Sequence, residues 1–188
     1  MTPQSHFRSI MTLGALVLSV SVSAIAQAQT QVVPQIVPND AEIVHVMITA
    51  NQLDIDGGKL AKAKSKNPEV KLFAEQMITD HSAVNQQTSD LAKKLGLKPQ
   101  DNAASKALSK RGKDALANLK KLSGKEFDKK YVDQDVAFHM AVLTTIDQTL
   151  IPNVKNDELK GLIFEVRPTI AIHLNHAKRL QSSLNTLK

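Results

Sequence analysis

Four polar residues lie on helical stripes that are otherwise apolar, and their side chains are of types that bind metal ions. A stripe of apolar residues at three- and four-residue spacing is the face that a helix buries, so polar residues on it are expected inside the protein. Converging imidazole and carboxylate groups suit zinc, iron, copper or manganese (Zn, Fe, Cu or Mn). The four candidate ligands are Asp54, His81, His139 and His173.

The positions of these residues along their helices predict that they meet at one depth. Each lies about 12–15 residues from a turn or a helix end, which at 1.5 Å per residue is about 18–22 Å. Two neighbours are secondary candidates: Asp135 lies one turn before His139, and His176 lies three residues after His173. A single metal ion held near the middle of a helical bundle is therefore one hypothesis.

A second interpretation needs no metal. Each histidine can be satisfied separately by a backbone carbonyl, a water molecule or a neighbouring side chain, with Asp135 pairing with His139 one turn away. The pattern of di-iron carboxylate bundles, a Glu-x-x-His on each of two helices plus further Glu, is absent from the sequence, which argues against ferroxidase or oxygen-activating chemistry. A metal-dependent oxidoreductase is therefore the weakest of the three hypotheses.

Composition excludes several other classes of site. The 188 residues contain no cysteine, which rules out disulfides, thiolate metal sites, iron–sulfur clusters and thiol nucleophiles. No Gly-x-Ser-x-Gly elbow and no glycine-rich phosphate loop occurs, so hydrolase and nucleotide-binding interpretations have no support. The sequence names no catalytic residue and no substrate.

The N-terminal residues predict export. A short basic segment precedes an apolar run over residues 10–26, followed by small residues typical of a signal-peptide cleavage site. Cleavage is expected after Ala26 or Ala28, giving a signal peptide over 1–28, an extended leader over 29–39 and one helical domain over 40–188. We expect the mature protein in the periplasm or cell envelope, without a transmembrane segment and without a nucleic-acid partner.

Apolar periodicity beyond the leader is helical throughout, with no strand-like alternation. It predicts helices over 40–65, 68–95, 105–122, 123–152 and 156–187. Asp40, Asn67 and Asn156 are expected N-caps, and Ser123 opens a capping-box pattern. Gly96 is expected to stop the second helix.

The connections between these helices predict their arrangement. Short links join the first pair near 66 and the last pair near 153, so each pair is expected to be antiparallel. The weaker helix over 105–122 is long enough to run back along the bundle, since 18 residues span about 27 Å. Gly57 and Gly58 are expected to allow close approach of a neighbouring helix. The expected fold class is all-α: a ferritin-like four-helix bundle with a shorter crossover helix between helices 2 and 3.

Three motifs resemble those of the bacterial family called domain of unknown function 4142. They are the Asn-Pro-Glu-Val-Lys and Phe-Ala-Glu-Gln-Met-Ile-Thr-Asp-His segments over 67–81, Phe-Asp-Lys-Lys-Tyr over 127–131 followed by His139, and Pro168 followed by His173-Leu174. The resemblance covers about residues 40–185. It implies a ferritin-like exported bundle with no established activity. His81, His139 and His173 fall on motif positions, whereas Asp54 stands where Glu is more usual.

Positive charge is concentrated in one segment. Residues 105–130 hold nine basic and three acidic side chains, whereas the chain as a whole has a formal net charge of +6. The segment could dock on an anionic envelope surface such as lipid headgroups, or it could be the solvated face of the crossover helix. Our leading hypothesis is an exported bundle that binds one metal ion. The alternative is a non-catalytic structural, interaction or stress-related envelope protein whose buried histidines are packing elements.

Overall fold

The computed structural model describes residues 37–186, and the predicted signal peptide and residues 29–36 of the predicted leader lie outside them. The described chain is helical and contains no strand, which confirms the predicted all-α class. Its helices are α1 (Asp40–Lys64), α2 (Pro68–Lys94), α3 (Ala103–Lys120), α4 (Gly124–Thr145), the π-helical turn η1 (Ile146–Leu150), α5 (Ile151–Asn153) and α6 (Asp157–Thr186). No helix among them has the length and apolar character that crossing a bilayer requires.

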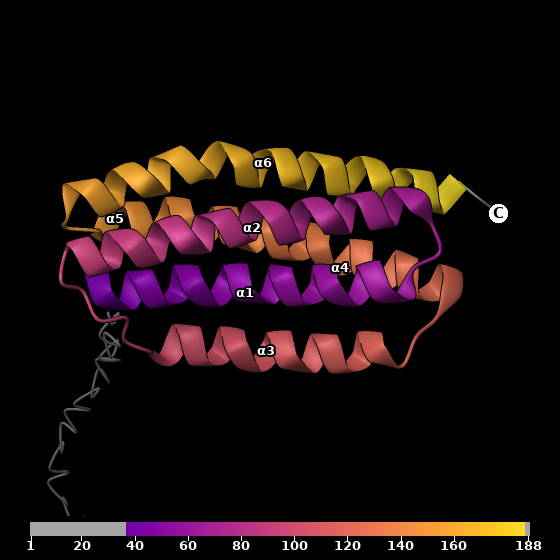
Figure 1. The fold of residues 1–188 in the computed structure, drawn as a ribbon, viewed down its shortest axis with the longest axis horizontal. Helices are drawn as coiled ribbons and strands as arrows, with labels where there is room; N and C mark the ends of the chain where they lie inside the picture. The colour runs from indigo at the N-terminus through magenta and orange to yellow at the C-terminus, as the bar shows by residue number, and fades with distance from the viewer. Residues whose placement is uncertain (1–36, 187–188) are drawn as a thin grey trace, which may run out of the picture. The chain divides into compact units, whose positions relative to one another are not determined.

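The long helices α1, α2, α4 and α6 lie alongside one another (Figure 1). The neighbours α1 and α2 run in opposite directions, as do α4 and α6. Between these pairs, α3 runs back along the outer side of α1, so that α2 and α4 point the same way (Figure 1). The predicted antiparallel pairs and returning helix are therefore present.

Local sequence signals explain where most helices begin and end. The Asn67 side-chain oxygen accepts hydrogen bonds from the backbone N–H groups of Glu69 and Val70, and Pro68 follows at the first helical position. The Asn156 side chain caps α6 in the same way. Gly96 follows α2 with a φ of 66°, and the N–H groups of Gly96 and Leu97 satisfy carbonyls of the last turn. These predictions are confirmed.

Two predicted caps are wrong. Asn39, not Asp40, caps α1, through a reciprocal capping box with Glu42. The Asp40 carboxylate instead accepts hydrogen bonds from the backbone of Lys155 and Asn156, which ties the start of α1 to the loop before α6. Ser123 makes no side-chain capping bond, because Gly124 leads into α4 with a φ of 56° instead of the helical conformation.

The predicted helix over 123–152 ends within one residue of Pro152, as expected, but its winding changes before the proline. Proline has no N–H, and its ring clashes with the carbonyl four residues earlier. The preceding turn, η1, is accordingly π-helical, with the N–H of Ile151 bonded to the carbonyl of Ile146 five residues back. The short helix α5 then includes Pro152 and ends at Asn153. In α6, by contrast, the helix continues through Pro168.

Close helix contacts occur where glycine removes a side chain. A Cβ atom at Gly58 would lie 2.8 Å from the carbonyl oxygen of Ala74, so α1 and α2 approach more closely there than alanine permits. This confirms the expectation for Gly58, whereas a Cβ at Gly57 would make ordinary contact with Tyr131. A Cβ at Gly112 would collide with the Leu53 side chain, so this glycine lets α3 pack on α1.

The apolar core forms two clusters rather than one. One cluster gathers residues near the start of α1 with the end of α2, η1 and the first half of α6, including Ile43, Leu150 and Ile163. The other includes Phe73 and Phe127 and gathers the remaining ends of the long helices. Between the two clusters, each long helix contributes one of the polar residues predicted to be buried, so the candidate ligands form a layer across the core.

Candidate metal centre

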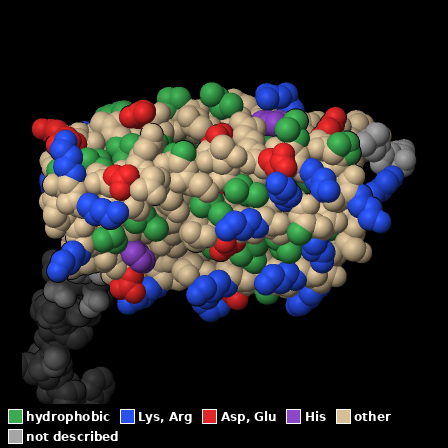
Figure 2. Space-filling model, viewed as in Figure 1, with side chains coloured by type: hydrophobic (Ala, Val, Ile, Leu, Met, Phe, Trp, Pro, Cys, Tyr) green, Lys and Arg blue, Asp and Glu red, His purple; other side chains and the backbone are tan. Residues whose placement is uncertain are grey.

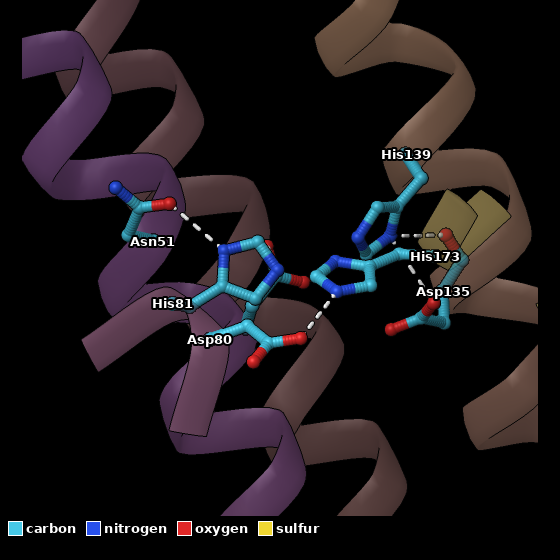
Figure 3. A network of polar contacts seen from close by, with 7 residues as sticks. Asn51, Asp80, His81, Asp135, His139 and His173 are labelled. Atoms are coloured by element: carbon cyan, nitrogen blue, oxygen red, sulfur yellow. Dashed lines mark hydrogen bonds and ion pairs between the residues drawn. The ribbon is translucent and has the colours of Figure 1, made fainter. Parts of the chain in front are cut away.

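Three histidines converge from three helices in the polar layer. His81 of α2, His139 of α4 and His173 of α6 are 1%, 0% and 1% exposed. One ring nitrogen of each lies within 4.8 Å of those of the other two, and the ring centroids are 5.1–5.6 Å apart. Figure 3 shows the three rings facing one another between the helices. Helix packing therefore brings together residues that are far apart in sequence.

Each imidazole is held through one nitrogen by an oxygen acceptor. His81 Nδ1 lies 2.8 Å from Asn51 Oδ1, and His173 Nε2 lies 2.9 Å from Asp80 Oδ2 (Figure 3). His139 Nδ1 lies 3.1 Å from the backbone carbonyl oxygen of Asp135 in the preceding turn. Such partners fix the ring orientation and the tautomer, as the outer-shell partners of metal-binding histidines do.

The second nitrogen of each ring is buried without a hydrogen-bond partner among residues 37–186. These atoms are His81 Nε2, His139 Nε2 and His173 Nδ1. A buried nitrogen with no partner costs free energy, and three such atoms in one cluster are unusual. Because imidazole lone pairs are strong ligands for zinc, copper and iron, the donor set fits a metal ion.

Two carboxyl groups besides that of Asp80 border the histidine cluster. Asp54 Oδ2 lies 3.4 Å from His81 Nε2, and ligand atoms of Asp54, Asp135 and His139 lie within 4.8 Å of one another. Asp135 Oδ2 is also 3.1 Å from His139 Nδ1, so this carboxylate contacts the side of the ring that faces away from the cluster. Asp54 is therefore placed to join the histidines, and Asp135 is placed to orient one of them.

Burial and mutual charge shift the protonation of these groups. Burial raises the pKa of Asp54 from its usual 3.8 to about 8, although the nearby His139 opposes the shift. Burial lowers the pKa of His81 far below its usual value, and His139 and His173 lower it further. Burial would also lower the pKa of His139, but the Asp135 carboxylate outweighs it and raises that pKa to about 9. Without a metal, the layer thus holds protonated Asp54, neutral His81 and protonated His139 near neutral pH.

His176, a secondary candidate, does not join the cluster. Its Nδ1 lies 3.0 Å from Gln76 Oε1, and its ring packs edge-on against Phe73 at 5.0 Å. The helical period explains this: three residues beyond His173, the side chain is rotated toward α2 and lies one level further along α6. It is therefore a useful control residue for the histidines of the cluster.

Sequence reasoning missed two residues that hold the rings, Asn51 and Asp80. Asn51 lies three residues before Asp54 and therefore on nearly the same face of α1, a signal that was available. Asp80 immediately precedes His81, so its side chain points away from its neighbour and toward another helix. Its partner, His173, is 93 residues away, and only the packing of α2 against α6 reveals the pair.

Fold and site together define an all-α protein with three buried histidines converging between two apolar core clusters. The family model described as "Domain of unknown function (DUF4142)" matches residues 24–180, and the chain belongs to this family, as its motifs indicated. No curated protein and no solved structure matches the chain.

Proposed function

We propose that this protein is an exported ferritin-like helical bundle that binds one metal ion through His81, His139, His173 and Asp54. The observation that carries the proposal is the set of three convergent histidines, each with one nitrogen held by an acceptor and the other buried without a partner. Bonding to one cation would satisfy all three nitrogens at once. Among the described residues, none of the three nitrogens has a hydrogen-bond partner.

The ligand types in the cluster favour zinc or a transition-metal ion over calcium or magnesium. Three imidazoles and one carboxylate suit zinc, iron, copper or manganese better than calcium or magnesium, which prefer oxygen ligands. The apolar clusters on either side of the layer limit access of water, which strengthens ligand–metal interactions. Asp54 would supply the negative charge, and Asn51, Asp80 and Asp135 would hold the three rings in place.

The ferritin-like and exported parts of the proposal have different support. The order of two antiparallel pairs joined by a helix that returns along the bundle is the connectivity of ferritin-like folds. Export is supported by the signal-like residues 1–28, which the sequence alone provides. We therefore propose the periplasm or cell envelope as the site of action.

Metal analysis of protein purified without chelators tests the central proposal. We expect close to one Zn, Fe, Cu or Mn per chain, and we expect the melting temperature to rise when that metal is added to stripped protein. His81→Gln should reduce metal content by at least about tenfold. His176→Gln, a half-buried histidine outside the cluster, should leave it unchanged.

The packing alternative makes the opposite prediction. If the histidines are only packing elements of the core, metal content stays below about 0.1 per chain, and added metal leaves the melting temperature unchanged. His81→Leu would then be tolerated or stabilising, since it removes a buried nitrogen without a partner. That pair of results would refute the metal proposal even if the fold is as described.

The basic segment over 105–130 supports a second, separate role in docking on an anionic envelope surface. Lysine and arginine side chains gather along the edge of the molecule where α3 lies (Figure 2). Lys113, Lys120 and Lys121 are exposed. We expect binding to vesicles containing anionic lipid that weakens as salt rises, and Lys113→Gln with Lys120→Gln and Lys121→Gln should weaken it. Equal binding to neutral vesicles would refute this role.

A further inference from the structure

A second site lies beside the histidine layer, in a partly open cavity of about 440 Å³ lined mainly by α1, α3, α4, η1 and α6. Pockets that bind small molecules commonly have volumes of about 300–1,000 Å³. Along α1, the lining extends from Val46 to Gly57. At a rise of 1.5 Å per residue, this stretch of helix is about 16 Å long. The cavity is therefore elongated along the helices and large enough for an organic molecule.

Most of the cavity wall is apolar. Its lining includes Leu53, Leu116, Phe138, Val142, Leu150 and Ile163. The packing of Gly112 on Leu53 brings α3 over this wall, and η1, whose π-helical winding departs from the regular helix, forms part of one end. An alkyl chain lying parallel to α1 would match this wall in both length and polarity.

Buried polar groups line the wall next to the histidines, while Arg111 on α3 and Gln134 and Thr145 on α4 line it elsewhere. Tyr131, Asp135 and Asp54 all line the cavity and are 4%, 6% and 8% exposed. The Tyr131 hydroxyl is buried without a hydrogen-bond partner among residues 37–186, and Asp135 Oδ2, which lies 3.1 Å from His139 Nδ1, has no other polar partner there. Tyr131 precedes Asp135 by one helical turn, so the two side chains lie on the same face of α4.

The Tyr131 hydroxyl and Asp135 Oδ2 have complementary hydrogen-bonding roles. A phenolic hydroxyl can donate one hydrogen bond, whereas a carboxylate oxygen can only accept. A ligand hydroxyl does both, because it accepts from Tyr131 and donates to Asp135. An anionic headgroup could accept from Tyr131, but at that position it would be repelled by the Asp135 carboxylate. Arg111, the cation in the lining, is exposed to solvent on α3.

We propose that this cavity binds one single-chain amphiphile with a non-ionic hydroxyl headgroup, with the head at Tyr131 and Asp135 and the alkyl chain along the apolar wall between α1 and α4. The class includes fatty alcohols and similar hydroxyl-bearing single-chain lipids. The site does not require a metal in the histidine cluster, so the proposal stands independently of metal binding. It gives the polar end of the ligand a position next to that cluster.

The protein carries its own reporter for this test. Tyr131 is the only tyrosine in the chain and there is no tryptophan, so tyrosine fluorescence arises from the cavity alone. Decanol titrated into the full-length protein below its solubility limit should change this fluorescence saturably with one ligand per chain, and calorimetry should give the same stoichiometry. Decanoate, with the same chain length and an anionic head, should bind at least about tenfold more weakly at pH 8.

Two matched substitutions on α3 localise the binding. Ala115 lines the cavity and Ala117, two residues on, is exposed outside it. Ala115→Phe should weaken decanol binding at least about tenfold by filling the cavity, and Ala117→Phe should leave it unchanged. Tyr131→Phe should weaken decanol binding, as measured by calorimetry with helicity retained, because the ligand hydroxyl loses its donor. The preference for decanol over decanoate should persist, because it arises from Asp135.

Several results would overturn the proposal. Equal affinity for decanol and decanoate would remove the role of the headgroup, and unchanged binding to Ala115→Phe would place the ligand elsewhere. A fluorescence change without saturation would mean non-specific partitioning. Failure to bind decanol together with concentration-dependent dimerisation, abolished by Ala115→Phe but not by Ala117→Phe, would assign the cavity wall to a second copy of the chain.

Discussion

The Nδ1 of His81 donates a hydrogen bond to the side-chain oxygen of Asn51 across 2.8 Å, linking α2 to α1. This contact decides which nitrogen of the ring faces the cluster. With the proton on Nδ1, the Nε2 lone pair is left available toward His139, His173 and Asp54. Asn51 thus prepares one ligand without being a ligand itself.

Asn51→Leu should therefore weaken metal binding while leaving its stoichiometry at one per chain. Loss of a hydrogen-bond partner of a ligating histidine typically reduces metal affinity by about 10–100-fold. Competition with a chromophoric chelator measures the change. Gln52→Leu is the matched control, because Gln52 is the next residue on α1 but is exposed and bonds only to Asp56. Equal affinities of the two variants would show that the Asn51–His81 contact has no bearing on the metal.

Asp54→Asn should have opposite effects on metal binding and on the stability of the metal-free protein. The pKa of Asp54 is raised by burial from 3.8 to about 8, so the folded state holds this proton more tightly than the unfolded state. Its contribution to stability is therefore fully present below about pH 4 and is lost as pH rises toward 8. Asparagine carries no charge to bury, so the metal-free variant should be more stable at pH 8 by at least about 1 kcal/mol.

Urea unfolding of the stripped proteins at pH 5 and pH 8 measures this difference. The gain from Asp54→Asn should be larger at pH 8 than at pH 5, and the same variant should bind metal more weakly. Asp56→Asn, two residues further on the partly exposed face of α1, should show neither effect. A loss of metal-free stability at both pH values would mean that the Asp54 carboxyl is a structural hydrogen-bonding group.

Metal affinity should rise steeply with pH. Near neutral pH the metal-free site retains protons on Asp54, with a pKa of about 8, and on His139, with a pKa of about 9. Both must be released before these side chains can act as ligands. Between pH 6 and pH 8, affinity should therefore increase about 10–100-fold per pH unit. Proton release measured in weakly buffered solution should reach one to two protons per metal, and pH-independent affinity would contradict this protonation state.

Gly58→Ala should destabilise the protein by about 1–3 kcal/mol. The added Cβ would lie 2.8 Å from the Ala74 carbonyl oxygen and 2.9 Å from Ile78 Cγ1, so α1 and α2 would have to separate. Gly161→Ala in α6 is the matched control, since nothing lies within 4 Å of its added Cβ and alanine is the better helix former. Thermal unfolding should show loss of stability in the first variant and a gain of about 0.5–1 kcal/mol in the second. A stabilising Gly58→Ala would mean that the two helices can separate at no cost.

The sequence was sufficient for the helices because their determinants are local. Asn67, Gly96 and Asn156 act within a few residues of their own position, and the apolar period fixes which face each helix buries. The depth of the histidines also followed from sequence, since a helix rises by a constant distance per residue. Where the sequence failed locally, at Ser123, a single positive φ at Gly124 had replaced the expected cap geometry.

Tertiary structure alone decided how the buried polar groups are paired and what lies beside them. The contacts of His81 with Asn51 and of His173 with Asp80 join residues 30 and 93 positions apart, and no periodicity encodes such pairs. The cavity likewise exists only because α3 packs over α1 and α4 while Gly112 sets how close it comes. A helix determines which of its residues face inward, but the orientation of one helix against another determines which inward residues meet. For this protein, sequence therefore identified the candidate ligands, and packing supplied their partners and the neighbouring cavity.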